Sequence, residues 1–450
     1  MNKKIVVLLK YFKGELNPFD GSALECALEL GGDITVVSMA PRSVLSALQS
    51  LTRLGVKAVL VSDDIYAGSD TQATSLILAE TIKKINPDLV FCGKQSVDGD
   101  TAQVPPMLAE RLGYDIKVGL MSFDGTTAIQ RNGNAVTLQN KTIYTFEKIR
   151  TLRFPSIFSK AGEVQVLDNS ILGLPREKCG LKGSPTRVIK SYESSVGRRE
   201  CEWKEFKDLP DLIKKGLEKP LISQSQDQTE KLEIVHFVGK VKDKAENIAK
   251  TAVELTVDGK TPSEFAREIE EKKVKVLLFE DSQELKIFAS RTAVITGAGI
   301  CADCISFRVE NERLVMTRPA LGGNVTADIV CESPIAFATV RTVKNESSKV
   351  IFSIGKGVID KIDKIKELAK EYGAEVCCSR IVADSGKMPY EKQVGLTGRT
   401  VCPKVYVAFG ISGAVQHTCA IAGAGTVIAV NINKKERIFD YADYGIIAEV

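Results

Sequence analysis

The sequence of 450 residues contains only two histidines and one tryptophan, and aromatic residues make up 6% of it. Metal sites built on histidine are therefore scarce, and we predict no metal ligands. No apolar run reaches the roughly 20 residues that a membrane-spanning helix needs. The net charge of +4 is not gathered into a basic block with interleaved aromatics. Nucleic acid is therefore not expected as a partner.

The eleven cysteines are an odd number and are scattered along the chain. The first residues hold an apolar run that is too short for a secretory signal and has no cleavage site after it. Free thiols in a reducing cytoplasm are the expected state, without an integral membrane segment. The only Cys-x-x-Cys pair is Cys301 and Cys304, and no second pair lies near it. We expect two half-buried thiols there.

The length allows two or three domains. Residues 1–115 alternate apolar runs with helical patterns, which indicates βαβ units and a parallel sheet. Short strands at 134–140 and 155–160 are expected to extend that sheet in antiparallel fashion. The predicted boundaries are a nucleotide-binding domain at 1–189, a polar arm that carries Trp203 at 190–230, a shortened domain at 231–342, and a last domain at 343–450.

An internal repeat is predicted between residues 87–123 and 274–307. Both segments show strand, polar loop, helix, glycine and strand, and both end in Ser-Phe. The predicted fold class is therefore α/β, with two Rossmann-like (adenine-nucleotide alpha-hydrolase-like) domains. A doubly wound parallel sheet follows in the last domain.

Four loops in the last domain follow predicted strands and should meet at one edge of the sheet. They are Gly355-Lys356-Gly357, Ser379-Arg380, Gly410 to Gly413, and Asn431. Glycine turns before helices expose backbone N–H groups, which suits a pyrophosphate. The loops therefore predict a dinucleotide site.

The two histidines are interpreted differently. His236 lies in a predicted strand and is expected to be a core side chain. His417 lies in the first turn of the helix after Gly413. It either packs on its own helix or contacts the ligand. Helix N-termini disfavour a cation, so an isolated imidazole there should be neutral.

The stretch "QVGLTGRTVCPKVYVAFGISGAVQH", followed by "VIAVN" and "DYADYG", resembles the FAD-binding domain of the electron transfer flavoprotein alpha subunit. The resemblance implies that Arg380 lies over the isoalloxazine and stabilises reduced, anionic flavin, with Ser379 beside it. It places Gln393 and Thr397 on the flavin ring and His417 near the flavin O2. The FAD contacts it implies are Gly355, Lys356, Gly357, Ser379, Arg380, Gln393, Val394, Gly395, Thr397, Gly410, Ser412, Gly413, Ala414, Gln416, His417, Asn431, Asp443 and Tyr444. Asn431 and Asp443 would serve the adenosine half.

The front of the chain resembles the beta subunit of the same flavoprotein, through "NPFDGSALECAL", "DLVFCGKQSVDGDTAQV" and "KGSPTRVIKSY". Residues 274–342 resemble part of the alpha subunit, so the chain resembles a fusion of the two. The resemblance implies a second nucleotide, AMP or a second FAD, at Asp98, Gly99, Asp100, Thr101, Ala102, Gln103 and Val104. The alternative is a capped helix start with Asp100 or Thr101 as N-cap.

The resemblance implies a carrier of electrons between a dehydrogenase, such as an acyl-CoA dehydrogenase, and an acceptor, with ferredoxin or flavodoxin as further partners. No catalytic residue is predicted. One alternative is an enzyme, a flavin-based electron-bifurcating NADH oxidoreductase with FAD at both sites. Another is a nucleotide-binding scaffold without redox activity. The oligomeric state stays open.

Four features depart from the family pattern. Lys356 stands where the family usually has arginine, and lysine lacks the planar fork of donors. The chain stops at Val450, before the usual final helix. The loop at 10–20 is short, and no basic partner-recognition segment is found between Ser159 and Gly183. We therefore expect flavin potentials and partner choice to differ from those of the family.

Overall fold

A computed structural model describes residues 3–131, 133–193, 198–219, 230–323, 325–342, 348–395 and 398–449. The chain divides into two compact units. The first comprises Met1–Lys190, Gln228–Leu321 and Ala327–Val340, and the second comprises Ser191–Asp227, Gly322–Thr326 and Arg341–Val450. Among the described residues, no helix is long and apolar enough to cross a membrane.

The first unit is built on a nine-stranded sheet with the order β11-β5-β4-β1-β6-β10-β7-β8-β9. Neighbouring strands from β11 to β7 are parallel, and β8 and β9 extend the sheet in antiparallel fashion as predicted. The strands are β1 (Lys4–Leu8), β4 (Asp33–Met39), β5 (Lys57–Val61), β6 (Leu89–Gly93), β7 (Asp115–Phe123), β8 (Thr127–Gln130), β9 (Ala135–Thr137), β10 (Thr142–Phe146) and β11 (Val164–Leu167).

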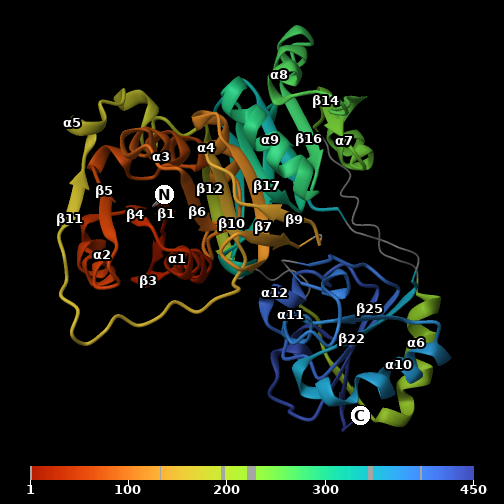
Figure 1. Cartoon of the computed structure of the whole chain (residues 1–450). Helices are drawn as coiled ribbons and strands as arrows, with labels where there is room; N and C mark the ends of the chain where they lie inside the picture. The colour runs from red at the N-terminus through yellow and green to blue at the C-terminus, as the bar shows by residue number, and fades with distance from the viewer. Residues whose placement is uncertain are drawn as a thin grey trace. The chain divides into compact units, whose positions relative to one another are not determined.

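Helices cover both faces of this sheet, because its central strands are apolar on both sides. Helices α1 (Pro18–Leu30) and α2 (Leu45–Thr52) pack on one face, and α3 (Thr71–Ile85) and α4 (Val104–Leu112) pack on the other. Figure 1 shows these two helical layers around the red and orange strands. A short hairpin of β2 (Tyr11–Phe12) and β3 (Glu15–Leu16) precedes α1, and α5 (Asn169–Leu172) follows β11.

The strand predicted at residues 155–160 is wrong. This segment has no strand neighbour, and its apolar side chains face solvent: Phe154 is 96% exposed and Phe158 is 87% exposed. The apolar residues here resemble a strand in sequence only. The next strand of the chain is β11, which starts at Val164 and forms the edge of the nine-stranded sheet beside β5.

The first unit also holds a parallel five-stranded sheet, β15-β14-β16-β21-β17, and a four-stranded sheet, β12-β20-β19-β18. The elements are β12 (Thr186–Glu193), β14 (Leu232–Val238), β15 (Ala249–Glu254), β16 (Val276–Glu280), β17 (Gly299–Cys304), β18 (Ser306–Glu310), β19 (Arg313–Ala320), β20 (Val325–Cys331), β21 (Ala336–Val340), α7 (Lys242–Ile248), α8 (Pro262–Glu271) and α9 (Gln283–Thr296). His236 lies in β14 and is 7% exposed. Burial lowers its pKa, as expected for a core histidine.

The topology supports the predicted repeat. Strands β6 and β7 flank β10, and β16 and β17 flank β21 in the same way. The connecting helices α4 and α9 pack on each other, and Arg291 pairs with Glu110 between them at 2.6 Å. The repeated strand–helix–strand segments therefore occupy equivalent places in two sheets.

The second unit has a six-stranded sheet, β13-β26-β25-β24-β22-β23, in which all neighbours are parallel. The strands are β13 (Glu202–Lys204), β22 (Val350–Ile354), β23 (Glu375–Cys378), β24 (Val405–Phe409), β25 (Thr426–Asn431) and β26 (Tyr444–Ile447). Helices α6 (Leu209–Glu218) and α10 (Ile362–Glu371) pack on one face. The short helix α12 (Val415–Thr418) leads into the layer on the other face, and α11 (Arg380–Asp384) follows β23. This is the predicted doubly wound sheet.

The segment predicted as a polar arm supplies β13 and α6 to this sheet. Trp203 of β13 packs against Phe439 with the rings tilted by 52° and a centroid distance of 4.8 Å, and the Lys434 ammonium lies 4.6 Å from the centre of the Trp203 ring. A Cβ on Gly445 would come within 2.9 Å of that ring, so glycine lets tryptophan lie across β26. Residues 220–229 of the predicted arm lie outside the described residues.

Candidate nucleotide and flavin sites

Two of the predicted loops in the second unit contact each other directly at the carboxyl edge of the sheet. The Gly355 N–H donates to the Phe409 carbonyl at 2.8 Å, and the Gly357 N–H donates to the Gly410 carbonyl at 3.1 Å. A Cβ on Gly355 would lie 2.2 Å from the Gly410 oxygen. Glycine is thus required at position 355 for the two loops to pack, and the Gly357 N–H is already used inside the protein.

The loop from Gly410 to Ala414 presents a row of backbone donors. The N–H groups of residues 411–414 donate to no acceptor in the described part of the chain. The loop bends through positive φ at Gly410 (60°) and Gly413 (84°). Asn431 holds it from behind, because its Nδ2 donates to the Ile411 carbonyl at 3.0 Å. Consecutive free N–H groups in a glycine turn fit a pyrophosphate.

The next helix contributes little to this fit. Helix α12 has four residues, from Val415 to Thr418. So short a helix adds little macrodipole, since the dipole grows by aligned peptides. The predicted phosphate site therefore depends on the loop donors.

The residues predicted to contact the flavin ring follow β23. Ser379 has a buried hydroxyl without a hydrogen-bond partner in the described chain. Gln393 is 1% exposed, and Val394 beside it donates its N–H to the Cys378 carbonyl at 2.8 Å. Ser379 and Gln393 are therefore brought to one end of β23, and the orphaned hydroxyl fits a polar ligand atom.

Other predicted contacts lie around this group. A Cβ on Gly395 would lie 3.1 Å from the Gln416 carbonyl, so the 393–395 loop approaches α12. Arg380 opens α11 with its side chain 36% exposed. Lys356 begins the short helix after Gly355, at the same edge. Thr397 lies outside the described residues.

His417 is a buried, neutral side chain. It is 6% exposed, and its Nε2 lies 2.8 Å from the Tyr406 hydroxyl. Burial lowers the pKa of His417 to about 4, and its Nδ1 is buried without a hydrogen-bond partner in the described chain. The predicted neutrality therefore has desolvation as its main cause. The role of Tyr406 was missed, although Tyr406 is on the same face of β24 as Ala408, next to the α12 layer.

Asp443 and Tyr444 are not brought together with the other predicted contacts. Tyr444 pairs with Ile428 near the amino end of the sheet, three residues before Asn431. The Asp443 carboxylate accepts the Val427 N–H at 2.8 Å and an ion pair from Arg199. The acidic side chain after the carboxyl end of β26 is Glu449, which pairs with Lys361 at 2.8 Å.

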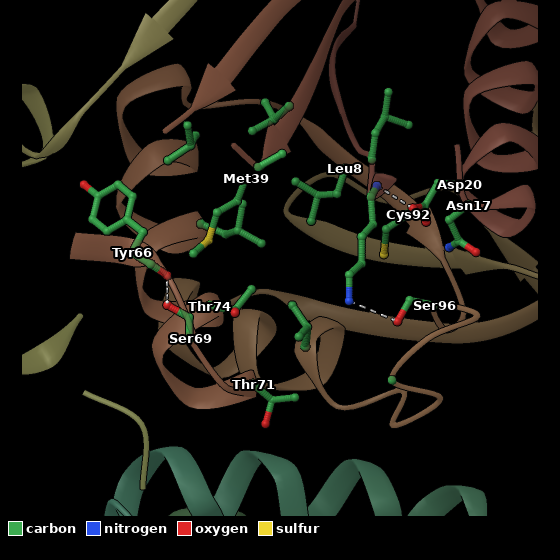
Figure 2. A pocket seen from close by; sticks show the side chains of 18 of the residues that line it. Leu8, Asn17, Asp20, Met39, Tyr66, Ser69, Thr71, Thr74, Cys92 and Ser96 are labelled. Carbon is green, nitrogen blue, oxygen red and sulfur yellow. Dashed lines mark hydrogen bonds between the residues drawn. The ribbon is translucent and has the colours of Figure 1, made fainter. Parts of the chain in front are cut away.

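The first unit contains a cavity of about 940 Å³ at the carboxyl ends of β1, β4, β5 and β6. This volume lies in the range of small-molecule sites. Figure 2 shows Asn17, Asp20 and Cys92 on one side of it and Tyr66, Thr71 and Thr74 on the other. The cavity thus combines apolar walls with a few polar groups.

The predicted loop Asp98–Val104 borders this cavity through Gly99 and residues 101–104. The N–H groups of residues 101–104 donate to no acceptor among the described residues. Helix α4 begins at Val104, and its N-cap Gln103 makes no side-chain cap. The alternative of an N-cap at Asp100 or Thr101 is therefore wrong, because the loop continues beyond both.

This loop is strained and held from two sides. Asp100 (φ 51°) and Ala102 (φ 54°) adopt the left-handed region without being glycine. Lys10 pairs with the Asp98 carboxylate at 2.8 Å. The Arg318 guanidinium donates to the Gly99 carbonyl at 2.7 Å. Strain of this kind costs about 1–3 kcal/mol per residue and persists where the surroundings enforce it.

Three further polar groups suit a ligand in the cavity. The Gln103 Nε2 and the Asn17 Oδ1 are buried without hydrogen-bond partners in the described chain. The Asp20 carboxylate accepts the N–H groups of Lys10 (2.7 Å) and Gly93 (2.9 Å). Burial raises the pKa of Asp20 to about 7, although these hydrogen bonds oppose the shift. Sequence reasoning missed Asp20, whose signal was an acid in the first turn of α1 after "NPF".

The cysteines are free thiols, and Cys301 and Cys304 are both buried. Within the described ranges, no three histidine, cysteine, aspartate or glutamate side chains gather as a possible metal site.

The chain matches two family models. The electron transfer flavoprotein domain matches residues 5–142 and 257–366, and the electron transfer flavoprotein FAD-binding domain matches residues 345–422. The first match takes in both copies of the repeat, and the second takes in the loops of the second unit from Gly355 to His417.

Known relatives of two kinds, named as alpha and beta subunits, match this chain. The chain is similar to the electron transfer flavoprotein subunit alpha of Thermoanaerobacterium thermosaccharolyticum, 33% identical over 42% of this chain and 71% of the relative. It is similar to subunit beta of the same organism, 35% identical over 41% of this chain and 77% of the relative. Protein FixA of Azorhizobium caulinodans is 35% identical over 43% of this chain and 78% of that protein.

Proposed function

Because this chain belongs to the electron transfer flavoprotein family, with beta-like and alpha-like parts in one polypeptide, we propose that it carries electrons from a flavin dehydrogenase to an acceptor protein. The observation that supports this most is the row of free N–H groups at residues 411–414. It lies inside the segment that matches the FAD-binding domain.

Each residue at this edge has a separate task in the proposal. The loop 411–414 binds the pyrophosphate, and the Ser379 hydroxyl and Gln393 orient the ring. Arg380 supplies positive charge that favours the reduced, anionic ring. Neutral His417 offers a hydrogen bond without a second full charge. The bound FAD supplies the one-electron chemistry, and no side chain of the protein needs to transfer a group.

The cavity of the first unit is proposed to hold the second nucleotide, with its phosphates on the N–H groups of residues 101–104. AMP would make the chain a simple carrier. A second FAD would make it a bifurcating NADH oxidoreductase. The cavity volume of about 940 Å³ supports this second candidate function. The volume lies at the upper end of the range for small-molecule sites.

A redox partner is proposed to contact the segment with exposed apolar side chains. Phe154, Ile157 and Phe158 are 96%, 83% and 87% exposed. Bulky apolar side chains this exposed are typical of docking sites. The eleven free cysteines fit a reducing, cytoplasmic setting.

FAD titration into the purified full chain, followed by flavin fluorescence, tests the proposed carrier. We expect saturable binding and reversible, stepwise reduction. Ser379→Ala should weaken binding about three- to tenfold through loss of one hydrogen bond. The matched control is Ser385→Ala, since the Ser385 hydroxyl only bonds the Val382 carbonyl of its own helix. A chain that binds no reducible flavin would refute the proposal.

A further inference from the structure

Arg380 has a carboxylate partner that is itself fixed in place. The Arg380 Nε donates to the Asp384 Oδ2 at 3.3 Å, across one turn of α11. The Tyr390 hydroxyl donates to the other oxygen, Asp384 Oδ1, at 3.0 Å. Tyr390 starts a short helical turn after Pro389. The carboxylate therefore bridges a cation and a phenol from two segments.

This arrangement does little for the stability of the fold. Arg380 and Asp384 are 36% and 46% exposed, and exposed pairs of this spacing contribute about 0.3–0.5 kcal/mol. Their order along α11, with arginine four residues before aspartate, is also the weaker order for an ion pair of this spacing. Another role must explain the placement.

We propose that Asp384 is a positioning residue, held by Tyr390, that fixes the direction of the Arg380 guanidinium and offsets part of its charge at the flavin. The inference rests on the proposed function, since it needs the flavin beside Arg380. The inference adds Asp384 and Tyr390 to that site. Together these residues lower the first one-electron reduction potential of the flavin.

The physical reason is the geometry of the charges. A free surface carboxylate rotates into water and is screened, but the hydrogen bond from Tyr390 keeps the Asp384 charge beside Arg380. The field of the guanidinium at any anion nearby is then partly cancelled. Arg380 still orients the flavin. The reduction potential of the flavin is lower than it would be if no carboxylate lay beside the Arg380 guanidinium.

The test is spectroelectrochemistry of the FAD-loaded full chain. Asp384→Asn keeps the size of the side chain and removes its charge. We expect the one-electron reduced state to form about fivefold more favourably, which corresponds to about 40 mV at 59 mV per tenfold. Tyr390→Phe should move the potential in the same direction by less. Asp384→Glu, the conservative variant, should stay closer to the wild type.

Salt provides a second readout that a purely structural role would not move. The difference between wild type and Asp384→Asn should shrink as ionic strength rises, because the pair is partly exposed. With FAD bound at full stoichiometry, an unchanged or lowered potential in Asp384→Asn overturns this inference and leaves the proposed function standing. Failure of the wild type to bind FAD overturns both.

Discussion

The loop 98–104 of the first unit and the loop 410–414 of the second present the same chemistry by different means. Both expose four consecutive N–H groups without acceptors in the described chain. The second loop bends through Gly410 and Gly413, while the first bends through Asp100 and Ala102. One loop is thus shaped by its own sequence, and the other is shaped by neighbours that hold it, such as Lys10 and Arg318.

The two loops should therefore respond differently to substitution. A glycine loop fails when a side chain is added, because the space is filled by backbone. A strained loop improves in stability when strain is removed, because its residues resist the conformation they adopt. Replacing glycine by alanine should therefore destabilise the loop 410–414. Replacing alanine by glycine should stabilise the loop 98–104.

The largest effect is expected from Gly413→Ala. The new Cβ would lie 2.1 Å from the backbone nitrogen of Ile438, at φ 84°. We expect a loss of more than 4 kcal/mol for the loop conformation and at least a hundredfold loss of FAD affinity. The matched control is Gly373→Ala, which has φ 56° and no atom within 4 Å, and should cost about 1 kcal/mol. Near-normal FAD affinity in Gly413→Ala would contradict the assignment of the loop 410–414 to FAD binding.

The two units should also respond to acid in opposite directions. The folded pKa of His417, about 4, lies below its ordinary 6.5, so its contribution is present above pH 6.5 and is lost as pH falls toward 4. The folded pKa of Asp20, about 7, lies above its ordinary 3.8, so stability is highest below pH 3.8 and falls as pH rises to 7. The effects are worth up to roughly 3 kcal/mol for His417 and roughly 4 kcal/mol for Asp20.

Trp203 belongs to the second unit and is the only tryptophan, so urea unfolding followed by its fluorescence reports that unit. The first unit can be followed by hydrogen exchange of β1 and β6. The pH slopes should flatten in His417→Gln and in Asp20→Asn, each in its own unit. Equal slopes in variant and wild type would refute these assignments.

Arg380→Ala should come next in size. Loss of the cation should make the one-electron reduced state about tenfold less favourable, a change opposite to that expected for Asp384→Asn. Arg380→Lys keeps the charge and should recover part of the effect. The measurement is the one-electron reduction potential of bound FAD. Equal potentials in wild type and Arg380→Ala would contradict the placement of Arg380 at the flavin.

The smallest effect is expected from Ala102→Gly in the first unit. Removing the strain at φ 54° should stabilise the unit by about 1 kcal/mol. Ala67→Gly is the matched control, because Ala67 has φ −61° and should lose about 0.5–1 kcal/mol. Thermal unfolding of both variants measures the difference, and a loss of stability in Ala102→Gly would contradict the strained-loop description.

The sheets were predictable because buried parallel strands are continuous apolar runs, as in β1, β6 and β24. The glycine turn at 410–413 was predictable because glycine marks positive φ. The positive φ of Ala102 was not predictable. Alanine has no preference for this conformation, which residues distant in the sequence impose. The position of Asp443 at the amino end of β26, away from Asn431, was not predictable, because proximity in a motif does not tell which end of a strand a residue occupies.

Tertiary contacts explain the remaining misses. The Tyr406–His417 hydrogen bond joins a strand to the next helix, and only the packing of the layer brings them together. The strand β13 has three residues and no apolar periodicity, so it depends on β26 for its pairing. Such elements form because a sheet edge is available to them.

Two separate nucleotide sites are tested most directly by the identity and number of nucleotides released from the purified chain. We expect two nucleotides per chain, one of them FAD, and we expect Gly413→Ala to lose that FAD and to keep the nucleotide of the first unit. A chain that releases no FAD after reconstitution, or one that loses both nucleotides together in Gly413→Ala, would contradict the description of two separate sites.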